Sequence, residues 1–372
     1  FSIVTALWVL RDLDQKNSKI LSQLMAALFF FMGLMSKENT ITFLAIIPLS
    51  VYLFRGRKWR PALLSISGPL LATLVFLGIR FSVLGSSFGE APLELMNNPF
   101  LKWTGENYVR MGFLEKSPII LYSLGMYLWL FVFPHPLSHD YYPLEIPQTS
   151  FSDPFVLLSL FLYALLATAI FYFWKSKPWI SFGVLIFLSS LSIVSNIVFP
   201  VGTNMSERFL FMPSVGLSLL AGGALMQLRK RSALLLIFTG LITFFFSIKT
   251  ISRNTVWKDN YTLFTTDVQN SDNSAKLQNA AAGALIDRSV RLDGAEKEAS
   301  LRRAIDHLKR ARELHPTYKS PNLLLGNAYF YLGQHEKAVE YFNKALQQDP
   351  NFADAKLNLA LSQRELNKFD KC

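Results

Sequence analysis

The sequence is poor in cysteine and in charge, and both shortages narrow the class of protein. Its 372 residues include one cysteine, Cys372, which excludes a disulfide framework or a cysteine metal site within the chain. Charged residues make up 17% of the chain, against about 25% in ordinary soluble domains. Residues 1–250 contain 19 basic and 11 acidic residues, in short clusters between long apolar runs. A single soluble globule is therefore excluded.

Motifs of soluble enzymes are also missing. The sequence has no P-loop, no glycine-rich dinucleotide turn, no HExxH and no GxSxG. The net charge of +11 could suggest nucleic acid, but the basic clusters lie at the ends of apolar runs. In that position they are orientation signals of a membrane protein, so we expect no nucleic-acid partner.

Apolar runs recur through the first 250 residues and predict a polytopic bundle of transmembrane helices. The first run starts at Phe1 without a methionine and is too short to cross a bilayer, so we expect the chain to be a fragment of a longer protein. Several others are short, which favours helices packed in a bundle. The runs cover residues 1–10, 20–35, 40–54, 61–79, 118–134, 154–174, 180–199, 209–228 and 233–250.

Three nearly acid-free basic loops predict the orientation of the bundle. They are residues 55–60, 174–179 and 229–232, and the positive-inside rule places all three in the cytoplasm. The C-terminal part then lies on the non-cytoplasmic side, provided that residues 118–134 form a re-entrant or interfacial element. Their Pro118 and Gly125 favour that interpretation. If this segment crosses the membrane instead, the C-terminal part is cytoplasmic.

Residues 251–372 are predicted to form a tetratricopeptide-repeat solenoid, separate from a membrane domain of residues 1–250. Small residues that let two helices approach, aromatic residues between them and a closing proline recur at the spacing of a 34-residue repeat. An earlier, degenerate copy contains Ala304, Leu308 and Ala311, and a third begins at Ala353, giving about two and a half repeats. The matching positions are Leu325, Gly326, Tyr329, Gly333, Ala338, Phe342, Ala345 and Pro350.

Ionisable residues near the outer ends of the spans are the candidate site, because a charge inside the membrane is costly unless it is paired or hydrated. Lys37 and Glu38 separate two apolar runs, and Glu207 and Arg208 open a later span. The cations either bind a phosphate at the headgroup level, with the acids orienting them, or only mark a turn and anchor a helix at the interface.

The loop FPHPLSHDYYPLEIP adds His139 and Asp140, and Arg80 ends an earlier span. Aromatic and acidic residues in such a loop suit a sugar, although aromatic residues at a membrane edge also form an interfacial belt. The spacing of histidine and acid is too irregular for a zinc site, so we assign no metal ligand.

In combination, several segments resemble the transmembrane and tetratricopeptide repeat-containing O-mannosyltransferases. These are GT-C-type membrane glycosyltransferases that use polyprenyl-phosphate sugars. The matching segments are GLMSKENTITFL, FPHPLSHD, ERFLFMPSVG and RNTVWKDNYTLF, followed by the repeats. The resemblance implies an all-α fold: a GT-C-like transmembrane bundle followed by the repeat solenoid.

The same resemblance implies transfer of a sugar, mannose, from a lipid phosphate to a protein hydroxyl outside the cytoplasm. Lys37 and Glu38 correspond to the family's residues near the lipid phosphate, Glu207 and Arg208 to its pair at the later span, and Asp140 to its loop aspartate. The family's acidic catalytic motif is expected upstream of Phe1, so no catalytic residue is assigned.

Partners and location follow from the same comparison. We expect a lipid donor in the membrane and a protein or peptide acceptor held by the repeats, in either a bacterial cell membrane or the endoplasmic reticulum. Many members of the wider class use a divalent metal, but none is assigned here. The alternative function is a non-enzymatic membrane scaffold whose repeats bind a partner protein.

Overall fold

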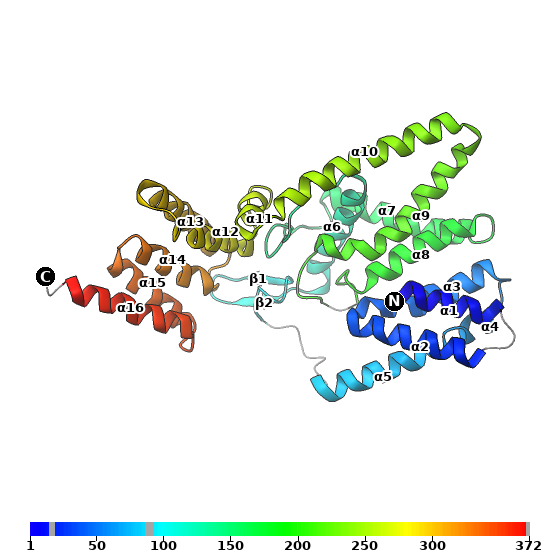
Figure 1. Cartoon of the computed structure of the whole chain (residues 1–372), viewed down its shortest axis with the longest axis horizontal. Coiled ribbons are helices and arrows are strands. Elements are labelled where there is room, and N and C mark those ends of the chain that lie inside the picture. Colours follow the sequence, from blue (N-terminus) through cyan, green and yellow to red (C-terminus); the bar gives the residue numbers. More distant parts are fainter. Residues whose placement is uncertain (15–18, 86–92, 199, 370–372) are drawn as a thin grey trace.

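The computed structural model describes residues 1–14, 19–85, 93–198 and 200–369, and Cys372 lies outside them. Apart from one small hairpin, the described elements are helical, which confirms the predicted all-α fold. The molecule is elongated: a helical bundle forms one end and the repeats form the other (Figure 1). The N-terminus lies in the bundle, and α16, the last described helix, lies near the tip of the repeats.

The first part of the bundle consists of helices that run back and forth. A 3-10 turn joins the second helix to the third, at the site of the Lys37–Glu38 pair. The element bounds are α1 Ser2–Asp14, α2 Lys19–Ser36, η1 Glu38–Thr42, α3 Phe43–Phe54, α4 Trp59–Leu64 and α5 Ser67–Leu84.

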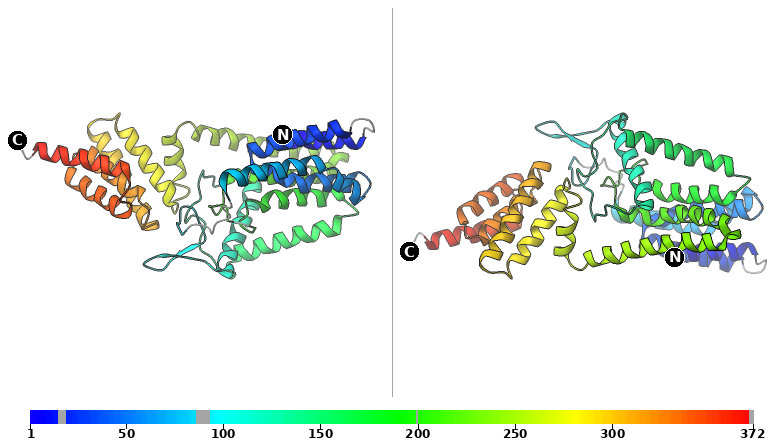
Figure 2. Two further views of the ribbon diagram at one scale, coloured as in Figure 1. Left: turned by 90° about the horizontal axis from the view of Figure 1, so that it is seen from below. Right: turned by 90° about the horizontal axis from the view of Figure 1, so that it is seen from above.

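A hairpin and a crosswise helix separate the two parts of the bundle. Strands β1 (Leu101–Trp103) and β2 (Tyr108–Arg110) pair antiparallel and lead into α6 (Phe113–Val132). Figure 2 shows α6 lying across the ends of α7 and α8 rather than alongside them. This arrangement agrees with an interfacial helix, although its place relative to the membrane stays a prediction. Helix α6 begins five residues before the predicted start because the Glu115 carboxylate accepts a hydrogen bond from the Gly112 N–H, at 2.7 Å.

The second part of the bundle supplies the most apolar helices. Of the described helices, those spanning Pro154–Phe173, Glu207–Lys230 and Ser232–Val256 are long and apolar enough to cross a membrane. All 25 residues of the last one, α10, are at least partly exposed, as expected for a helix surrounded by lipid. The element bounds are α7 Pro154–Phe173, α8 Pro178–Ser192, η2 Glu207–Leu210, α9 Phe211–Leu225, η3 Met226–Lys230 and α10 Ser232–Val256.

The basic loops lie at the end of the bundle away from the repeats. Two of them are in contact, because the Arg57 guanidinium donates a hydrogen bond to the Lys175 carbonyl at 3.0 Å. Tyr52 stacks on Trp59 and also contacts Trp174. The third loop follows α9, whose antiparallel packing on α8 brings it to the same end. The three basic loops therefore lie at one end of the bundle, as their charge predicts. That this end faces the cytoplasm stays a prediction.

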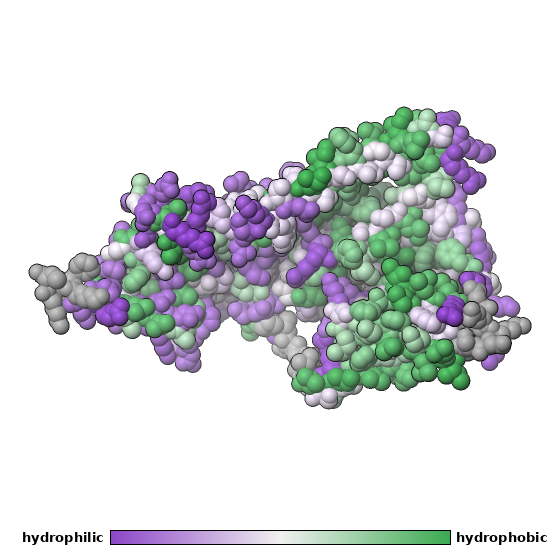
Figure 3. All heavy atoms as spheres, viewed as in Figure 1, coloured by the Kyte–Doolittle hydropathy of each residue, from purple (hydrophilic) through white to green (hydrophobic). Residues whose placement is uncertain are grey.

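The repeats stack as antiparallel helix pairs. In the pair α14/α15, Phe342 is fully buried, and a Cβ added at Gly326 would lie only 2.3 Å from its ring. Gly333, at φ +74°, makes the turn between the two helices. The bundle is hydrophobic outside whereas the repeats are largely hydrophilic (Figure 3). The bounds are α11 Asn260–Asp267, α12 Ala275–Ser289, α13 Gly294–Leu314, α14 Ser320–Tyr331, α15 His335–Gln348 and α16 Ala353–Phe369.

The predicted domain boundary at residue 250 lies inside a helix. Helix α10 continues to Val256, and α11 follows before the first helix pair of the repeats. The apolar run ends near residue 250, but the backbone remains helical for a further turn and a half. The membrane part and the repeats are therefore joined by the end of α10 and by the short helix α11.

Candidate functional site

The loop of residues 133–147 is the centre of the candidate site and lies between the bundle and the repeats. Its backbone is held by a carboxylate from the start of the span that contains α9. Glu207 accepts hydrogen bonds from the Ser138 N–H at 2.6 Å and from the Tyr141 hydroxyl at 2.7 Å. Burial, together with the Glu207 charge, raises the pKa of Tyr141, so the phenol stays protonated and remains a donor.

A second carboxylate fixes the same loop from the other side. Asp267 accepts hydrogen bonds from the His139 N–H at 2.8 Å and from the Arg253 guanidinium, and its side chain is fully buried. Arg253 belongs to the last turns of α10 and Asp267 ends α11. The loop, the long helix and the first helix beyond it therefore meet at one buried ion pair.

Asp267 is ionised despite its burial. Burial by itself disfavours the charge, but the hydrogen bonds from Arg253 and His139 outweigh it and lower the pKa of Asp267 to about 2. Because this value lies below the ordinary 3.8, the pair stabilises the fold fully above pH 4, and the contribution is lost as the pH falls towards 2. The junction is thus held by a permanent charge pair at neutral pH.

The loop also contacts the first repeat helix. The Asp140 carboxylate accepts a hydrogen bond from the Tyr142 N–H at 2.9 Å and lies 3.4 Å from the Lys276 ammonium. The Ser274 hydroxyl, at the N-cap of α12, donates to the Tyr142 carbonyl at 2.5 Å. In this structure His139 and Asp140 attach the loop to its neighbours.

The hairpin makes a further contact with the repeats. The Tyr108 hydroxyl on β2 lies 3.1 Å from His315 Nδ1, just after α13. Burial raises the pKa of Tyr108 to about 12 and lowers the pKa of His315 to about 4, so both are neutral at pH 7. The hairpin is therefore attached to the repeats by an uncharged hydrogen bond.

The structure gives two of the predicted acids partners other than their neighbours in the chain. Glu38 forms an ion pair with Arg80 on α5 instead of orienting its neighbour Lys37. Glu207 binds the loop at Ser138 and Tyr141 instead of holding Arg208. In both cases adjacent residues of a 3-10 turn or its cap point in different directions, so each acid reaches a partner far away in sequence.

Two of the seven predicted residues are therefore left as exposed cations. The Lys37 side chain is exposed and has no ion-pair partner among the described residues. Arg208 is exposed as well, and its guanidinium lies 5.4 Å from the centre of the Phe209 ring. Lys37 precedes η1 and α3, whose far end leads into the basic loop 55–60. Arg208 lies in η2 before α9, whose far end leads into the basic loop 229–232. Both cations therefore lie at the ends of their helices that face away from the basic loops.

Arg253 and Asp267 are the important site residues that the sequence did not single out. Arg253 lies within the quoted segment RNTVWKDNYTLF, so its presence was visible but its role was not. Asp267 lies in the polar stretch TTDVQNSDNS, residues 265–274, whose composition is typical of a solvated helix end. Only its contacts with His139 and Arg253 reveal that it is buried.

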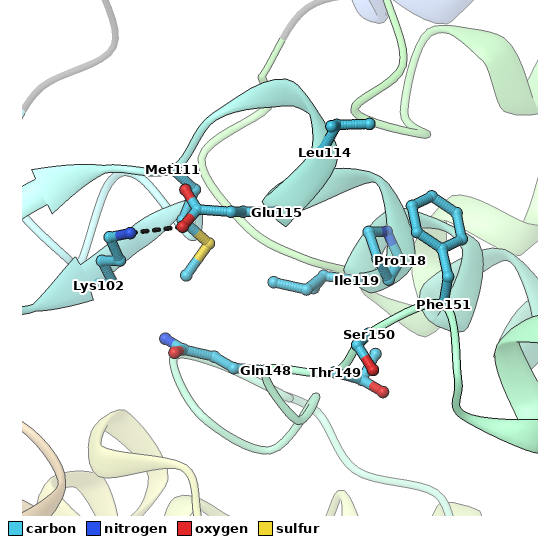
Figure 4. A pocket seen from close by; sticks show the side chains of 10 residues that line it. All are labelled: Lys102, Met111, Leu114, Glu115, Pro118, Ile119, Gln148, Thr149, Ser150 and Phe151. Atoms are coloured by element: carbon cyan, nitrogen blue, oxygen red, sulfur yellow. Dashed lines mark hydrogen bonds and ion pairs between the residues drawn. The ribbon is translucent and has the colours of Figure 1, made fainter.

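A cavity of about 340 Å³ opens beside the loop, between the hairpin and the start of α6 (Figure 4). Lys102 and Glu115 form an ion pair on one wall, and Phe151 and Pro118 lie opposite. None of the seven predicted residues lines it. Within the described ranges, no group of three His, Cys, Asp or Glu side chains could hold a metal ion, so we assign no metal ligand.

The fold and the site together define a helical membrane protein whose loop of residues 133–147 is attached to tetratricopeptide repeats. Residues 323–352 match the family model for the tetratricopeptide repeat, which confirms the predicted repeat. The computed structure also resembles the crystal structure of the P58(IPK) TPR domain, at 11% identity, covering 98% of this chain and 99% of the other. The TM-score of 0.26 is too low to support any conclusion from this likeness.

Curated relatives show what the chain is similar to. The chain is 28% identical over 165 residues to Protein O-mannosyl-transferase TMTC3 of Homo sapiens, covering 44% of this chain and 17% of the relative. It is 29% identical over 222 residues to human TMTC1, covering 56% and 24%. Tmtc2 of Drosophila melanogaster matches at 40% over 75 residues, covering 19% and 8%. The predicted resemblance to the transmembrane and tetratricopeptide repeat-containing O-mannosyltransferases is therefore confirmed, although these matches span at most about a quarter of each relative's length.

Proposed function

We propose that the chain is part of a membrane glycosyltransferase that moves mannose from a polyprenyl-phosphate donor to a protein hydroxyl. The names of the relatives, protein O-mannosyl-transferases, support the reaction class. The observation that supports the role of this part of the protein is the pair of exposed cations, Lys37 and Arg208, at the end of the bundle next to the repeats.

Transfer of the sugar requires positive charge beside the lipid phosphate. The acceptor oxygen attacks C1 of the sugar, the bond from C1 to the phosphate oxygen breaks, and the lipid phosphate leaves with the electron pair. A base takes the hydroxyl proton; we assign none to this chain. Lys37 presents a point charge and Arg208 a planar fork of donors, both suited to the phosphate as its charge increases.

The contacts between the loop, α10 and α11 allow the repeats to position the acceptor. Asp267 and Arg253 fix the loop of residues 133–147 to α11 and α10, the two helices that lead to the repeats. A protein acceptor bound by the repeats is then held at a constant distance from the end of the bundle. Such positioning lowers the entropic cost of bringing acceptor and donor together.

The topology proposed with this function is multi-pass, with the basic loops cytoplasmic and the repeats on the non-cytoplasmic side of a bacterial or endoplasmic reticulum membrane. The clustering of basic residues 55–60, 174–179 and 229–232 at one end supports it. A reporter fused after Lys249 that scored cytoplasmic would contradict it.

Single-cation variants of the full-length protein test the proposed reaction. We expect Lys37→Ala and Arg208→Ala each to reduce mannose transfer from a labelled polyprenyl-phosphate donor to a peptide by about 100-fold, as for loss of one charge-stabilising donor. Lys116→Ala, on α6, removes a cation at the same end of the bundle and should keep most of the activity. The readout is labelled peptide formed by equal amounts of membrane-inserted protein.

A second candidate function, a non-enzymatic membrane scaffold, is favoured by the structural use of Glu207, His139 and Asp140 in the junction. It predicts that neither Lys37→Ala nor Arg208→Ala changes the yield of mannosylated peptide. Normal transfer in both variants would therefore exclude our assignment of the two cations and favour the scaffold.

A further inference from the structure

A second cavity, of about 810 Å³, lies at the other end of the bundle, among the basic loops. It is bounded by the start of α8, the last turns of α9 and the η3 turn. Its lining combines three cations with apolar and small residues and contains no acidic side chain. The lining residues are Lys177, Trp179, Ser218, Leu219, Gly222, Gly223, Met226, Gln227, Arg229 and Lys230.

The three cations are available for a ligand. Lys177, Arg229 and Lys230 are exposed, and none forms an ion pair with any residue that the structure describes. Lys177 lies 5.9 Å from the centre of the Phe173 ring. Lys177 is also the N-cap of α8, a terminus at which no side chain accepts a hydrogen bond from the first turn. The partial positive charge of a helix N-terminus therefore adds to the positive charge of the cavity.

The cavity walls are built by close helix packing and leave one side open. Trp179 fits directly against Gly223, where an added Cβ would lie 2.1 Å from the indole ring. The adjacent Gly222 has no atom within 4 Å of its Cβ position, so it faces open space. Met226 and Leu219 are exposed apolar residues of the same lining. The site thus has a cationic end and an apolar wall, side by side.

We propose that this cavity binds the headgroup of an anionic phospholipid, in the leaflet that faces the basic loops. The phosphate meets Lys177, Arg229 and Lys230, and the upper part of the acyl chains lies along Leu219 and Met226. Basic cavities between transmembrane helices attract anionic headgroups through such clusters of cations. The site lies at the opposite end of the bundle from Lys37 and Arg208, so it is independent of the proposed sugar transfer.

Native mass spectrometry of the purified chain in detergent tests this site. Phosphatidylglycerol should remain bound as an adduct, whereas phosphatidylcholine, which has no net charge, should not. We expect Arg229→Gln/Lys230→Gln to bind phosphatidylglycerol about 30-fold more weakly, since each cation near a headgroup contributes roughly a factor of five. The matched control is Lys58→Gln/Arg60→Gln, which removes two cations at the same end but outside the cavity.

A variant that fills the cavity separates a built site from a general attraction of charge. Gly222→Leu places a side chain in the open space without changing any charge, and it should abolish the adduct while the melting temperature of the lipid-free protein stays the same. Retention of the adduct in Gly222→Leu, or equal loss in the Lys58/Arg60 control, would overturn the proposal. The proposal would also be overturned if millimolar inorganic phosphate protected the protein from thermal unfolding as much as phosphatidylglycerol does, because the ligand would then be a free anion and not a lipid.

Discussion

The bundle and the repeats are both helical, yet the same type of apolar side chain is exposed on the bundle and buried in the repeats. Phe245 on α10 is 63% exposed, whereas Phe342 on α15 is fully buried. In the membrane the hydrocarbon surrounds the helix, so an apolar side chain can point outwards at no cost. In water the same side chain is stable only between two helices of a repeat. An exposed phenylalanine therefore indicates a region surrounded by lipid, and a buried one is expected in a region surrounded by water.

The largest expected effect comes from removing a core aromatic residue of the repeats. Phe342→Ala leaves a cavity where Gly326 and Ala338 approach, and it should lower the free energy of unfolding by about 3–5 kcal/mol. Phe245→Ala, the matched change on α10, should change it by roughly 0.5 kcal/mol or less. The check is denaturant unfolding of the full chain in detergent, followed by circular dichroism. Equal losses in the two variants would show that α10 is packed against protein.

The second effect concerns the junction between the two regions. Asp267→Asn leaves the Arg253 charge in a buried site without its carboxylate and should cost about 3 kcal/mol. The predicted result is faster trypsin cleavage between α10 and α12, with the bundle intact. The control is Asp354→Asn, at an exposed position in the first turn of α16, which should be cleaved like the unmodified chain. Unchanged cleavage of Asp267→Asn would mean that the ion pair does not hold the junction.

The third effect is a pH dependence of stability, which we expect for the repeats and for their contact with the hairpin. Burial lowers the pKa of His315 to about 4, from the ordinary 6.5. The unfolded chain therefore takes up this proton at a higher pH than the folded one, and stability falls as the pH decreases from about 6.5 to about 4. Burial lowers the pKa of His307 as well, which adds in the same direction.

Melting curves at pH 7.5 and pH 5 should show this as a lower transition temperature for the repeats at pH 5. His315→Gln should remove a large part of the difference, and His135→Gln, at an exposed loop position, should not. A transition that is independent of pH in the unmodified chain would contradict the burial of a neutral His315.

Much of the fold could be predicted from local patterns. Most apolar runs correspond to helices of the bundle, because a span is recognised from its own composition. The run 61–79 is divided between α4 and α5, however, and α8 ends at Ser192, before the predicted end at residue 199. The repeat at residues 323–352 was recognised from small, aromatic and turn residues at fixed spacing, and Phe342 and Gly326 meet as that spacing requires. The end of α10 at Val256 was missed, because a helix can leave the membrane and remain helical.

The site could be predicted less well. The sequence placed Glu38 with Lys37 and Glu207 with Arg208, because outside the repeats no spacing rule relates residues that are far apart in the chain. In the structure Glu38 pairs with Arg80, 42 residues away, and Glu207 binds Ser138, 69 residues away. The buried Asp267 was overlooked for the same reason: its partner His139 is 128 residues distant.

The sequence by itself determined where helices form, which of them are apolar enough for a membrane and where a repeat recurs. These properties depend on the hydrophobicity and spacing of residues within one helix or one helix pair, so they need no knowledge of distant contacts. Tertiary structure alone decided which charged side chains are paired and which stay exposed. Electrostatic pairing acts through space over a few ångströms, so it depends on which chain segments the packing of the helices brings together.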